Sequence, residues 1–402
     1  MKKLFVIFIL LFAFSNLSFA ETKDELCVIA DSAIVAASKI RGLKQKRDVP
    51  CYVRDKEKVK AYLLDAIEKK MPAEKLINEG ILYKALGFLP KDFDYKNGII
   101  ELYLSQLGGY YDPEEDYFVM AGWMPKVLQT TIAVHELTHA LQDQEYDLSR
   151  LIDPLTGTSD HLMARSALVE GDATAVMFDY SRKLMGQEGL AVEDNVDSII
   201  MQNVAGSAFM TGMQGTPSSL QYMLLFPYTS GLRFAHYLLK KGSYQEIDKA
   251  FKKLPSSTEE VLHPEKYFSS KSDYQQISDE DIIKHLPGSE IVYRDTFGEF
   301  SVSALLSTYF KDHLKAAKAA EGWGGDAAAI LKLESDKKVI VWKTLWDTES
   351  DAKEFYDAYT KALTKHLENW TLNTASGKQE FANEDQKVSL SITDNEVFLL
   401  VE

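Results

Sequence analysis

Cysteine is scarce in this chain: only Cys27 and Cys51 occur among 402 residues. Two cysteines cannot complete a zinc site by themselves, and neither lies beside a histidine, so a metal-ligand or nucleophile role is disfavoured. An oxidising compartment would instead let them pair across a short loop. Chain-entropy arithmetic gives such a bridge roughly 3 kcal/mol of stabilisation. The sequence therefore predicts one disulfide, between Cys27 and Cys51.

Long apolar runs are also missing, except at the N-terminus. Met1-Lys2-Lys3 precedes an apolar stretch from Leu4 to Phe14, and Ser18-Phe19-Ala20 follows it. This is the layout of a secretory signal peptide, so we expect cleavage after Ala20 and a periplasmic or secreted mature chain. The alternative, an uncleaved anchor, needs about 20 apolar residues, which is more than this stretch provides. No later segment is apolar enough to span a bilayer, so we expect no stable membrane insertion of the mature chain.

Basic residues are fewer than acidic ones, 45 against 60, which gives a net charge of -15. Loss of Lys2 and Lys3 with the leader takes the mature chain to -17. Nucleic acids and anionic lipid surfaces are bound through clusters of Lys and Arg. The charge balance therefore argues against a nucleic-acid partner and is attributed to solubility.

Internal repeats and low-complexity tracts are absent from the sequence, and 46% of its residues are apolar, which is material for two or three packed domains. We expect an α+β fold that is mostly helical. Its expected parts are a signal peptide (1–20), an N-terminal helical region (21–95), a central domain (96–290) and a C-terminal α+β module (291–402). The N-terminal region, with expected helices at 56–69 and 73–86, fits either a propeptide or a helical lid.

The residue pattern changes after Gly98, where strand-like segments appear. Aromatic and β-branched runs flank Asp112-Pro113, which predicts a hairpin whose second strand spans Tyr117 to Ala121. Pro125 stands where a helix should begin, and Gly186 where another should stop. The remaining expected elements are helices at 126–145, 160–185, 302–320 and 350–367, a turn at 322–325, a hairpin across 330–346 and short strands to the C-terminus.

His135-Glu136-Leu137-Thr138-His139 is the most informative segment. On an α-helix, residues four apart lie about 40° apart around the axis and one turn along it, so both imidazoles can reach one ion. The apolar residues around them gather on the opposite side, which predicts a helix that buries one face and presents ligands on the other. Glu136 projects beside the expected metal.

Zinc needs a third protein ligand and, in catalytic sites, leaves its fourth position to water. Glu170 is the predicted third ligand. Its neighbours Ser166, Ala167, Ala173 and Thr174 are small, so we expect this helix to approach the histidine helix closely. His135, His139 and Glu170 form the predicted Zn²⁺ site.

These motifs resemble those of the gluzincin metallopeptidases, in which an HExxH helix is completed by a glutamate on a following helix. The resemblance rests on His135 to His139, on the Val169-Glu170-Gly171-Asp172-Ala173 box and on the strand Tyr117 to Ala121. It implies a zincin-like catalytic domain over 96–290, with a short β-sheet edge hairpin beside the histidine helix. The string from His135 to Gln144, with flanking segments, also resembles uncharacterised secreted bacterial and archaeal proteins.

The motif predicts a mechanism in which zinc lowers the pKa of its water toward ~7 and Glu136 takes the proton as that water attacks a peptide bond. Peptidases of this type usually add a Tyr or His donor to the developing oxyanion. Tyr228 and His263 are the candidates, although a core aromatic beside Pro227 and a helix-end hydrogen bonder are equally good interpretations. Asp143 and Asp172 are candidates for orienting an imidazole, with a solvated role as the alternative.

Two function classes remain. The favoured one is an exported zinc-dependent peptidase acting on peptides or proteins, and the other is a noncatalytic envelope protein with a structural zinc site. Glu136 separates them, because a structural site has no use for a general base beside an open coordination position.

Overall fold

The computed structural model describes residues 23–106, 108–205, 213, 215–270 and 274–402. The expected signal peptide and its cleavage point after Ala20 lie outside these residues. Within the described ranges, none of the helices combines the length and the apolar character needed to cross a bilayer.

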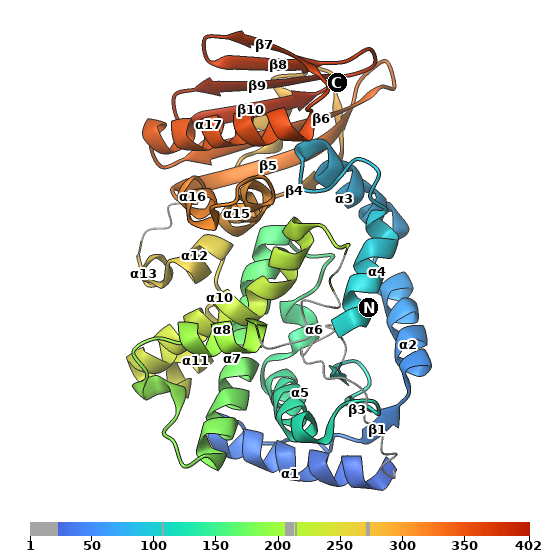
Figure 1. Cartoon of the computed structure of the whole chain (residues 1–402), viewed down its shortest axis with the longest axis vertical. Helices are drawn as coiled ribbons and strands as arrows, with labels where there is room; N and C mark the ends of the chain where they lie inside the picture. Colours follow the sequence, from blue (N-terminus) through green and yellow to red (C-terminus); the bar gives the residue numbers. More distant parts are fainter. Residues whose placement is uncertain (1–22, 107, 206–212, 214, 271–273) are drawn as a thin grey trace.

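The fold is α+β and 55% helical, so the expected class and its helical bias are confirmed. Figure 1 shows the C-terminal sheet at one end of the molecule and the helices that carry the motifs at the other. The helices are α1 (Lys23–Arg41), α2 (Lys56–Lys70), α3 (Ala73–Leu86), α4 (Tyr95–Gln106), α5 (Lys126–Tyr146), α6 (Leu148–Leu151), α7 (Ser159–Leu184), the 3₁₀ turn η1 (Leu190–Val192), α8 (Asp197–Ala205), α10 (Ser218–Gly242), α11 (Tyr244–Lys252), α12 (Thr258–Leu262), α13 (Pro264–Tyr267), α14 (Asp279–Ile283), α15 (Gly298–Tyr309), α16 (His313–Lys318) and α17 (Glu349–His366).

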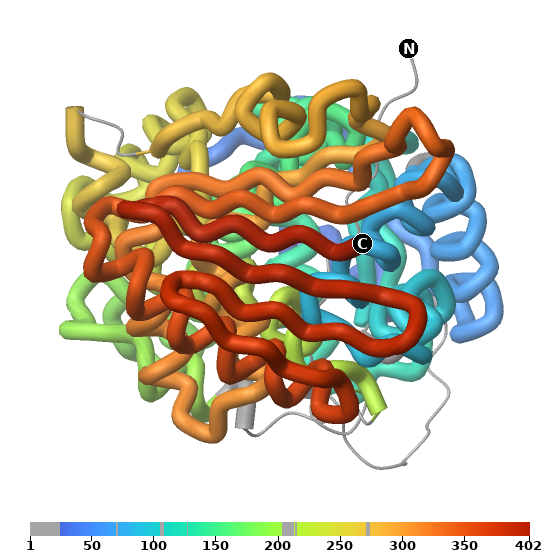
Figure 2. Tube along the Cα trace, turned by 90° about the horizontal axis from the view of Figure 1, so that it is seen from above, coloured from blue at the N-terminus to red at the C-terminus, as the bar shows by residue number. Residues whose placement is uncertain are grey.

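Seven strands form the C-terminal sheet in the order β4-β5-β6-β10-β9-β8-β7, all antiparallel, which Figure 2 shows from above. Trp342 and Leu399 point from adjacent strands into a core that also holds Phe355 of α17. The strands are β4 (Glu290–Asp295), β5 (Trp323–Lys332), β6 (Lys338–Trp346), β7 (Thr371–Ala375), β8 (Lys378–Ala382), β9 (Lys387–Thr393) and β10 (Glu396–Val401).

The turn expected at 322–325 is wrong in part, because strand β5 begins at Trp323 and its first residues pair with the end of β6. Glycines suggested a reversal there, but Gly325 lies so close to the Gln275 backbone that a Cβ would stand 2.3 Å from its carbonyl oxygen. The glycine permits close packing of two chain segments rather than a turn.

A second, small sheet lies beside α5, with the order β1-β3-β2. The hairpin of β2 (Gly109–Asp112) and β3 (Tyr117–Ala121) has the expected antiparallel pairing. The third strand, β1 (Cys51–Arg54), pairs with β3 in parallel and corrects the expectation of an all-helical N-terminal region. Four residues carry too short a pattern to identify a strand whose partner lies more than sixty positions away. Cys51 opens β1 and is bonded to Cys27 of α1, which ties α1 to the sheet.

The N-terminal helices pack into the body of the protein. Leu86 and Phe88, at the end of α3, belong to the same buried cluster as Trp342 and Tyr359 of the C-terminal module. The Tyr359 hydroxyl donates a hydrogen bond to the backbone carbonyl of Leu86 at 3.0 Å. Segments nearly three hundred residues apart therefore share one core.

Candidate metal centre

Helix α5 carries both histidines and is buried on every side along its middle. Pro125 precedes its first turn, and the residues from Ile132 to Gln142 are all buried. The helix contacts α1, α7 and the small sheet. Its apolar side packs against α1 and the small sheet, and α7 covers the ligand side through Glu170, so the ligand side is buried as well. Polar groups in such a place need partners inside the protein.

Three side chains converge on one point: His135 and His139 from α5, and Glu170 from the middle of α7. The two Nε2 atoms lie 3.0 Å apart. Glu170 Oε2 lies 3.1 Å from Nε2 of His135 and 3.6 Å from Nε2 of His139. Metal–ligand bonds of ~2.0 to 2.2 Å in a tetrahedron place ligand atoms about 3.3 Å apart. The observed separations therefore suit one metal ion held by these three residues.

The hydrogen bonds around His139 favour the same conclusion. Its Nδ1 lies 2.7 Å from Oε1 of Gln142, an atom that only accepts, so Nδ1 carries the proton and Nε2 presents a lone pair. Burial lowers the pKa of His139 and lowers that of His135 to about 3, so both rings are neutral. Neutral imidazoles whose Nε2 atoms point at each other and at a carboxylate leave a space that suits a cation.

Glu136 stands beside this group with a carboxyl that has no ordinary protein partner. Both of its oxygens are buried, and no hydrogen bond of standard geometry reaches either one from the described residues. Burial raises the pKa of Glu136 well above its usual range, the nearby Glu170 raises it further, and the Tyr111 backbone N–H opposes the shift. A bound cation would favour the charged form. The Glu136 carboxyl is placed to receive a proton from a molecule that enters the site.

A chain of polar contacts fixes the His139 ring through Nδ1, the nitrogen that faces away from the metal group. Gln142 accepts from His139 and donates through Nε2 to Asp172 Oδ2 at 2.8 Å and to the carbonyl of Val169 at 3.1 Å. Asp172 in turn accepts from Nε of Arg41 at 2.8 Å. Asp172 therefore reaches the imidazole through Gln142. The sequence did not point to Gln142, although Gln142 lies one turn beyond His139 on the same helix.

Arg41, at the end of α1, is the other residue that was missed. Its guanidinium is buried and also pairs with Asp248 at 2.7 Å. Nothing in its own neighbourhood of the sequence distinguishes it from a surface arginine. The pairing exists because α1 lies across α5 and α7.

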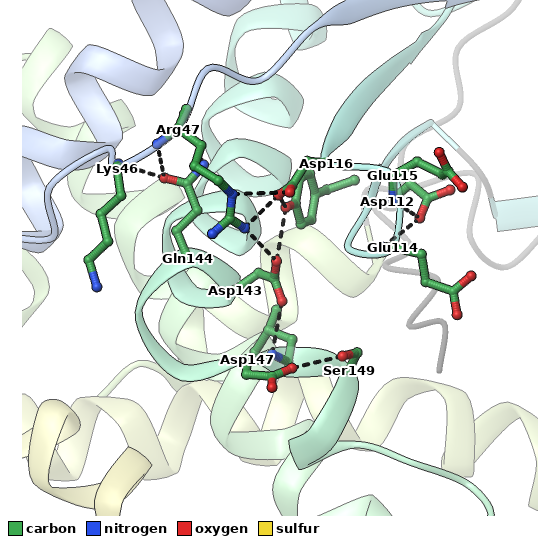
Figure 3. Close-up of polar contacts among 12 residues, drawn as sticks. Lys46, Arg47, Asp112, Glu114, Glu115, Asp116, Asp143, Gln144, Asp147 and Ser149 are labelled. Carbon is green, nitrogen blue, oxygen red and sulfur yellow. Dashed lines mark hydrogen bonds and ion pairs between the residues drawn. The ribbon is translucent and has the colours of Figure 1, made fainter. Parts of the chain in front are cut away.

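Asp143 does not orient an imidazole, contrary to one of the expectations. Figure 3 shows it in a cluster with Arg47, Asp116 and Gln144. Its carboxylate accepts from the Tyr111 hydroxyl at 3.1 Å and from the backbone N–H of Leu148 at 3.0 Å. Asp143 thus fixes the end of α5 to β2 and to the loop after α1.

The two candidate donors are placed very differently. The Tyr228 hydroxyl, from α10, donates to Oε1 of Glu170 at 3.0 Å, so Tyr228 lies at the metal group. His263 instead pairs with Glu299 through Nε2 at 2.8 Å. It is not among the residues that line the recess next to Glu170. The structure therefore brings Tyr228, but not His263, to the metal group.

Gly171 sets how closely α7 can approach its neighbour, and that neighbour is α10. A Cβ on Gly171 would lie 2.1 Å from the carbonyl oxygen of Gly231, and one on Gly231 would lie 2.3 Å from that of Ala167. The small residues around Glu170 were expected to admit the histidine helix. At Ala167 and Gly171 they admit α10, which delivers Tyr228 to Glu170.

Comparison with known proteins gives one match. Residues 288–401 match a family described as Domain of unknown function (DUF8575). The matched segment contains strands β4 to β10 and none of the residues of the metal group. No match was found among curated proteins or among solved structures.

Proposed function

We propose that this chain is an exported zinc-dependent peptidase with a zincin-like catalytic domain. Two features support that domain: a small sheet beside α5, and a glutamate on α7 that meets the two histidines of α5. The Cys27–Cys51 disulfide supports export, because such bonds persist in oxidising compartments.

Zinc is the proposed ion because of the donor set. Two neutral imidazoles and one carboxylate are the ligands of many catalytic zinc sites, whereas magnesium and calcium prefer sites built of oxygen atoms alone. Three protein ligands leave one position for water or substrate. Structural zinc sites usually take four protein ligands, and within the described residues the group has three.

Glu136 is the observation that carries the proposal. A zinc ion held by His135, His139 and Glu170 supplies Lewis-acid chemistry, lowering the pKa of a water toward ~7 and polarising a carbonyl. Glu136 then accepts the proton of the attacking water and delivers it to the leaving nitrogen. Among the described residues, no hydrogen bond of standard geometry has to break before the Glu136 carboxyl does so.

Tyr228 has a proposed part in holding the site. Its hydroxyl donates to the Glu170 oxygen that faces away from the histidines, which keeps the other oxygen directed at them. Gln142 does the same for His139 through Nδ1. Donation by Tyr228 to a developing oxyanion requires that its hydroxyl leave Glu170 when substrate arrives.

The test is Glu136→Gln. Glutamine nearly preserves volume but cannot take a proton, so peptide turnover should fall about 10²- to 10⁴-fold while zinc content stays close to one per chain. The measurements are metal analysis, thermal unfolding and digestion of a peptide library. Glu145→Gln, the same change at an exposed position of α5, is the matched control and should leave all three unchanged.

Three other outcomes would contradict the proposal. Unchanged turnover in Glu136→Gln would show that another group is the base. A wild type that is loaded with zinc and inactive on every peptide would favour the noncatalytic envelope protein. A wild type purified without chelators that holds no metal would remove the zinc site itself.

A further inference from the structure

A recess adjoins the metal group and is enclosed by helices α3, α4, α7 and α10. Its volume is about 280 Å³, and both Glu170 and Tyr228 line it. Small-molecule pockets in proteins begin at ~300 Å³. The recess therefore has room for one or two side chains beside the proposed reaction centre.

Helix α7 contributes a continuous stripe that leads to the metal group. Ser159, Leu162, Met163 and Ser166 line the recess at helical spacing, and Glu170 follows one turn later. From Ser159 to Glu170 the helix makes eleven rises of 1.5 Å, which give this wall a length of about 16 Å. The recess is thus elongated, with the metal group at one end.

Helix α10 contributes the opposing stripe. Leu220, Met223, Leu224 and Pro227 line the recess, and Tyr228 closes the series at Glu170. Their spacing places all five on one side of the helix. Both long walls therefore end at the same point, and their side chains before that point are largely apolar.

Helices α3 and α4 complete the enclosure with aromatic and aliphatic groups. Tyr83 comes from α3, and Tyr95, Ile99 and Tyr103 come from α4. Helix α3 belongs to the segment 21–95 that fits either a propeptide or a lid by sequence, and α4 begins at the last residue of that segment. Because they form a wall of the recess, their removal would take away part of the site.

Charge in the recess is compensated internally. Lys75 and Glu79 are its charged residues apart from Glu170 among those that the structure describes, and they pair at 2.8 Å. Glu79 also accepts from the hydroxyls of Tyr95 at 3.2 Å and Tyr293 at 3.5 Å. A charged side chain that entered would lose its hydration without gaining a partner.

From these observations we infer that the recess binds a large apolar side chain of a peptide substrate, next to the bond that is cleaved. This inference rests on the proposed function, because it assigns the substrate class of the same site. The apolar walls supply contact area, and the metal group at the end of the recess fixes the register of the peptide.

Binding and cleavage are measured separately, so that the two proposals fail separately. Fluorescent peptides that differ only in one residue, Phe or Asp, are titrated against zinc-loaded Glu136→Gln protein, in which bound peptide persists. Quenched versions of the same peptides are digested by the wild type. We expect the Phe peptides to bind and react at least about tenfold better, the scale on which apolar pockets discriminate.

Two charge substitutions at Met223 test whether the recess is the place where the substrate side chain is selected. Met223 is half-buried and lines it. Met223→Lys should shift preference from Phe to Asp at the selected position, and Met223→Glu should shift it to Lys. A variant that is merely damaged would weaken all peptides equally. Met201→Lys, at an α8 methionine that is 68% exposed, is the control and should keep the preference for Phe.

The results that overturn each idea differ. Equal binding of Phe and Asp peptides to Glu136→Gln protein would refute the apolar recess, whatever the wild type cleaves. Preferences that stay unchanged in both Met223 variants would refute it as well. Apolar peptides that bind selectively but are never cleaved by zinc-loaded wild type would support the recess and overturn the proposed peptidase.

Discussion

Gly171→Ala tests how the crossing of two helices positions Glu170, the proposed metal ligand. The added Cβ would lie 2.1 Å from the Gly231 carbonyl oxygen and 2.4 Å from its carbon. Real Cβ contacts to backbone essentially never fall below 3.0 Å. The obstacle is backbone on the partner helix, so no rotamer change relieves it, and α7 and α10 must separate by about 1 Å.

That separation has two consequences. Overpacking of this kind costs about 1 to 3 kcal/mol of stability. Glu170 immediately precedes Gly171, and the 3.0 Å hydrogen bond that it accepts from Tyr228 spans the same helix crossing. Metal ligation tolerates errors of about 0.2 Å, so a displacement several times larger should weaken zinc binding by at least tenfold.

The assay is zinc affinity by competition with a chromogenic chelator, beside thermal unfolding with and without EDTA. Gly157→Ala is the matched control, because a Cβ there meets its nearest neighbour, the Cβ of His161, at an ordinary 3.6 Å. It should keep both properties. Wild-type zinc affinity and thermal stability in Gly171→Ala would refute the argument that this contact sets the position of Glu170.

Three further changes test other parts of the structure. Gln142→Leu removes the acceptor that holds Nδ1 of His139, and chelator competition should show zinc affinity falling about 10- to 100-fold. Asp295→Asn removes a buried carboxyl whose pKa burial raises from 3.8 to about 6. Folding therefore takes up a proton between these values, and wild-type stability falls as the pH rises through them. Urea unfolding from pH 4 to 7.5 should show the variant gaining about 2 kcal/mol relative to wild type. Cys27→Ser opens the bridge to Cys51, which spans 24 positions, and should lower the free energy of unfolding by roughly 3 kcal/mol.

Each of these has its own contrary result. Unchanged zinc affinity in Gln142→Leu would show that zinc binding does not need the hydrogen bond from His139 Nδ1 to Gln142. A stability difference between Asp295→Asn and wild type that is the same at every pH would place the pKa of Asp295 outside this range. Stability of Cys27→Ser equal to that of the wild type under oxidising conditions would mean that the α1–sheet contact suffices without the bridge.

Local patterns gave most of the elements that surround the site. The helices at 56–69 and 73–86 were predicted within a residue of their observed ends, because Pro72 and the apolar spacing mark them. The hairpin of β2 and β3 and the long helices α5 and α7 were likewise predicted. By contrast, the helix expected at 302–320 is two helices, since Asp312 caps a new start for α16.

What the sequence determined by itself is the set of three residues that converge, His135, His139 and Glu170, and the helical form of the segments that carry them. Two histidines four apart on a helix must share a side of it, and this follows from helical geometry alone. The approach of Glu170 was an inference from composition, and the structure brings it within 3.1 Å of His135 Nε2. Small residues on α7 indicate a close helix neighbour but not which one, and at Ala167 and Gly171 that neighbour is α10.

Only the tertiary structure decided which distant residues surround the ligands. Arg41, Asp172 and Gln142 come together because α1 crosses α5 and α7, and β1 exists because a distant strand offers it an edge. The recess is built from side chains of four helices, α3, α4, α7 and α10, which lie far apart along the sequence. Secondary structure follows from forces between neighbours along the chain, whereas these contacts depend on how whole faces pack, and no short window of sequence records that packing.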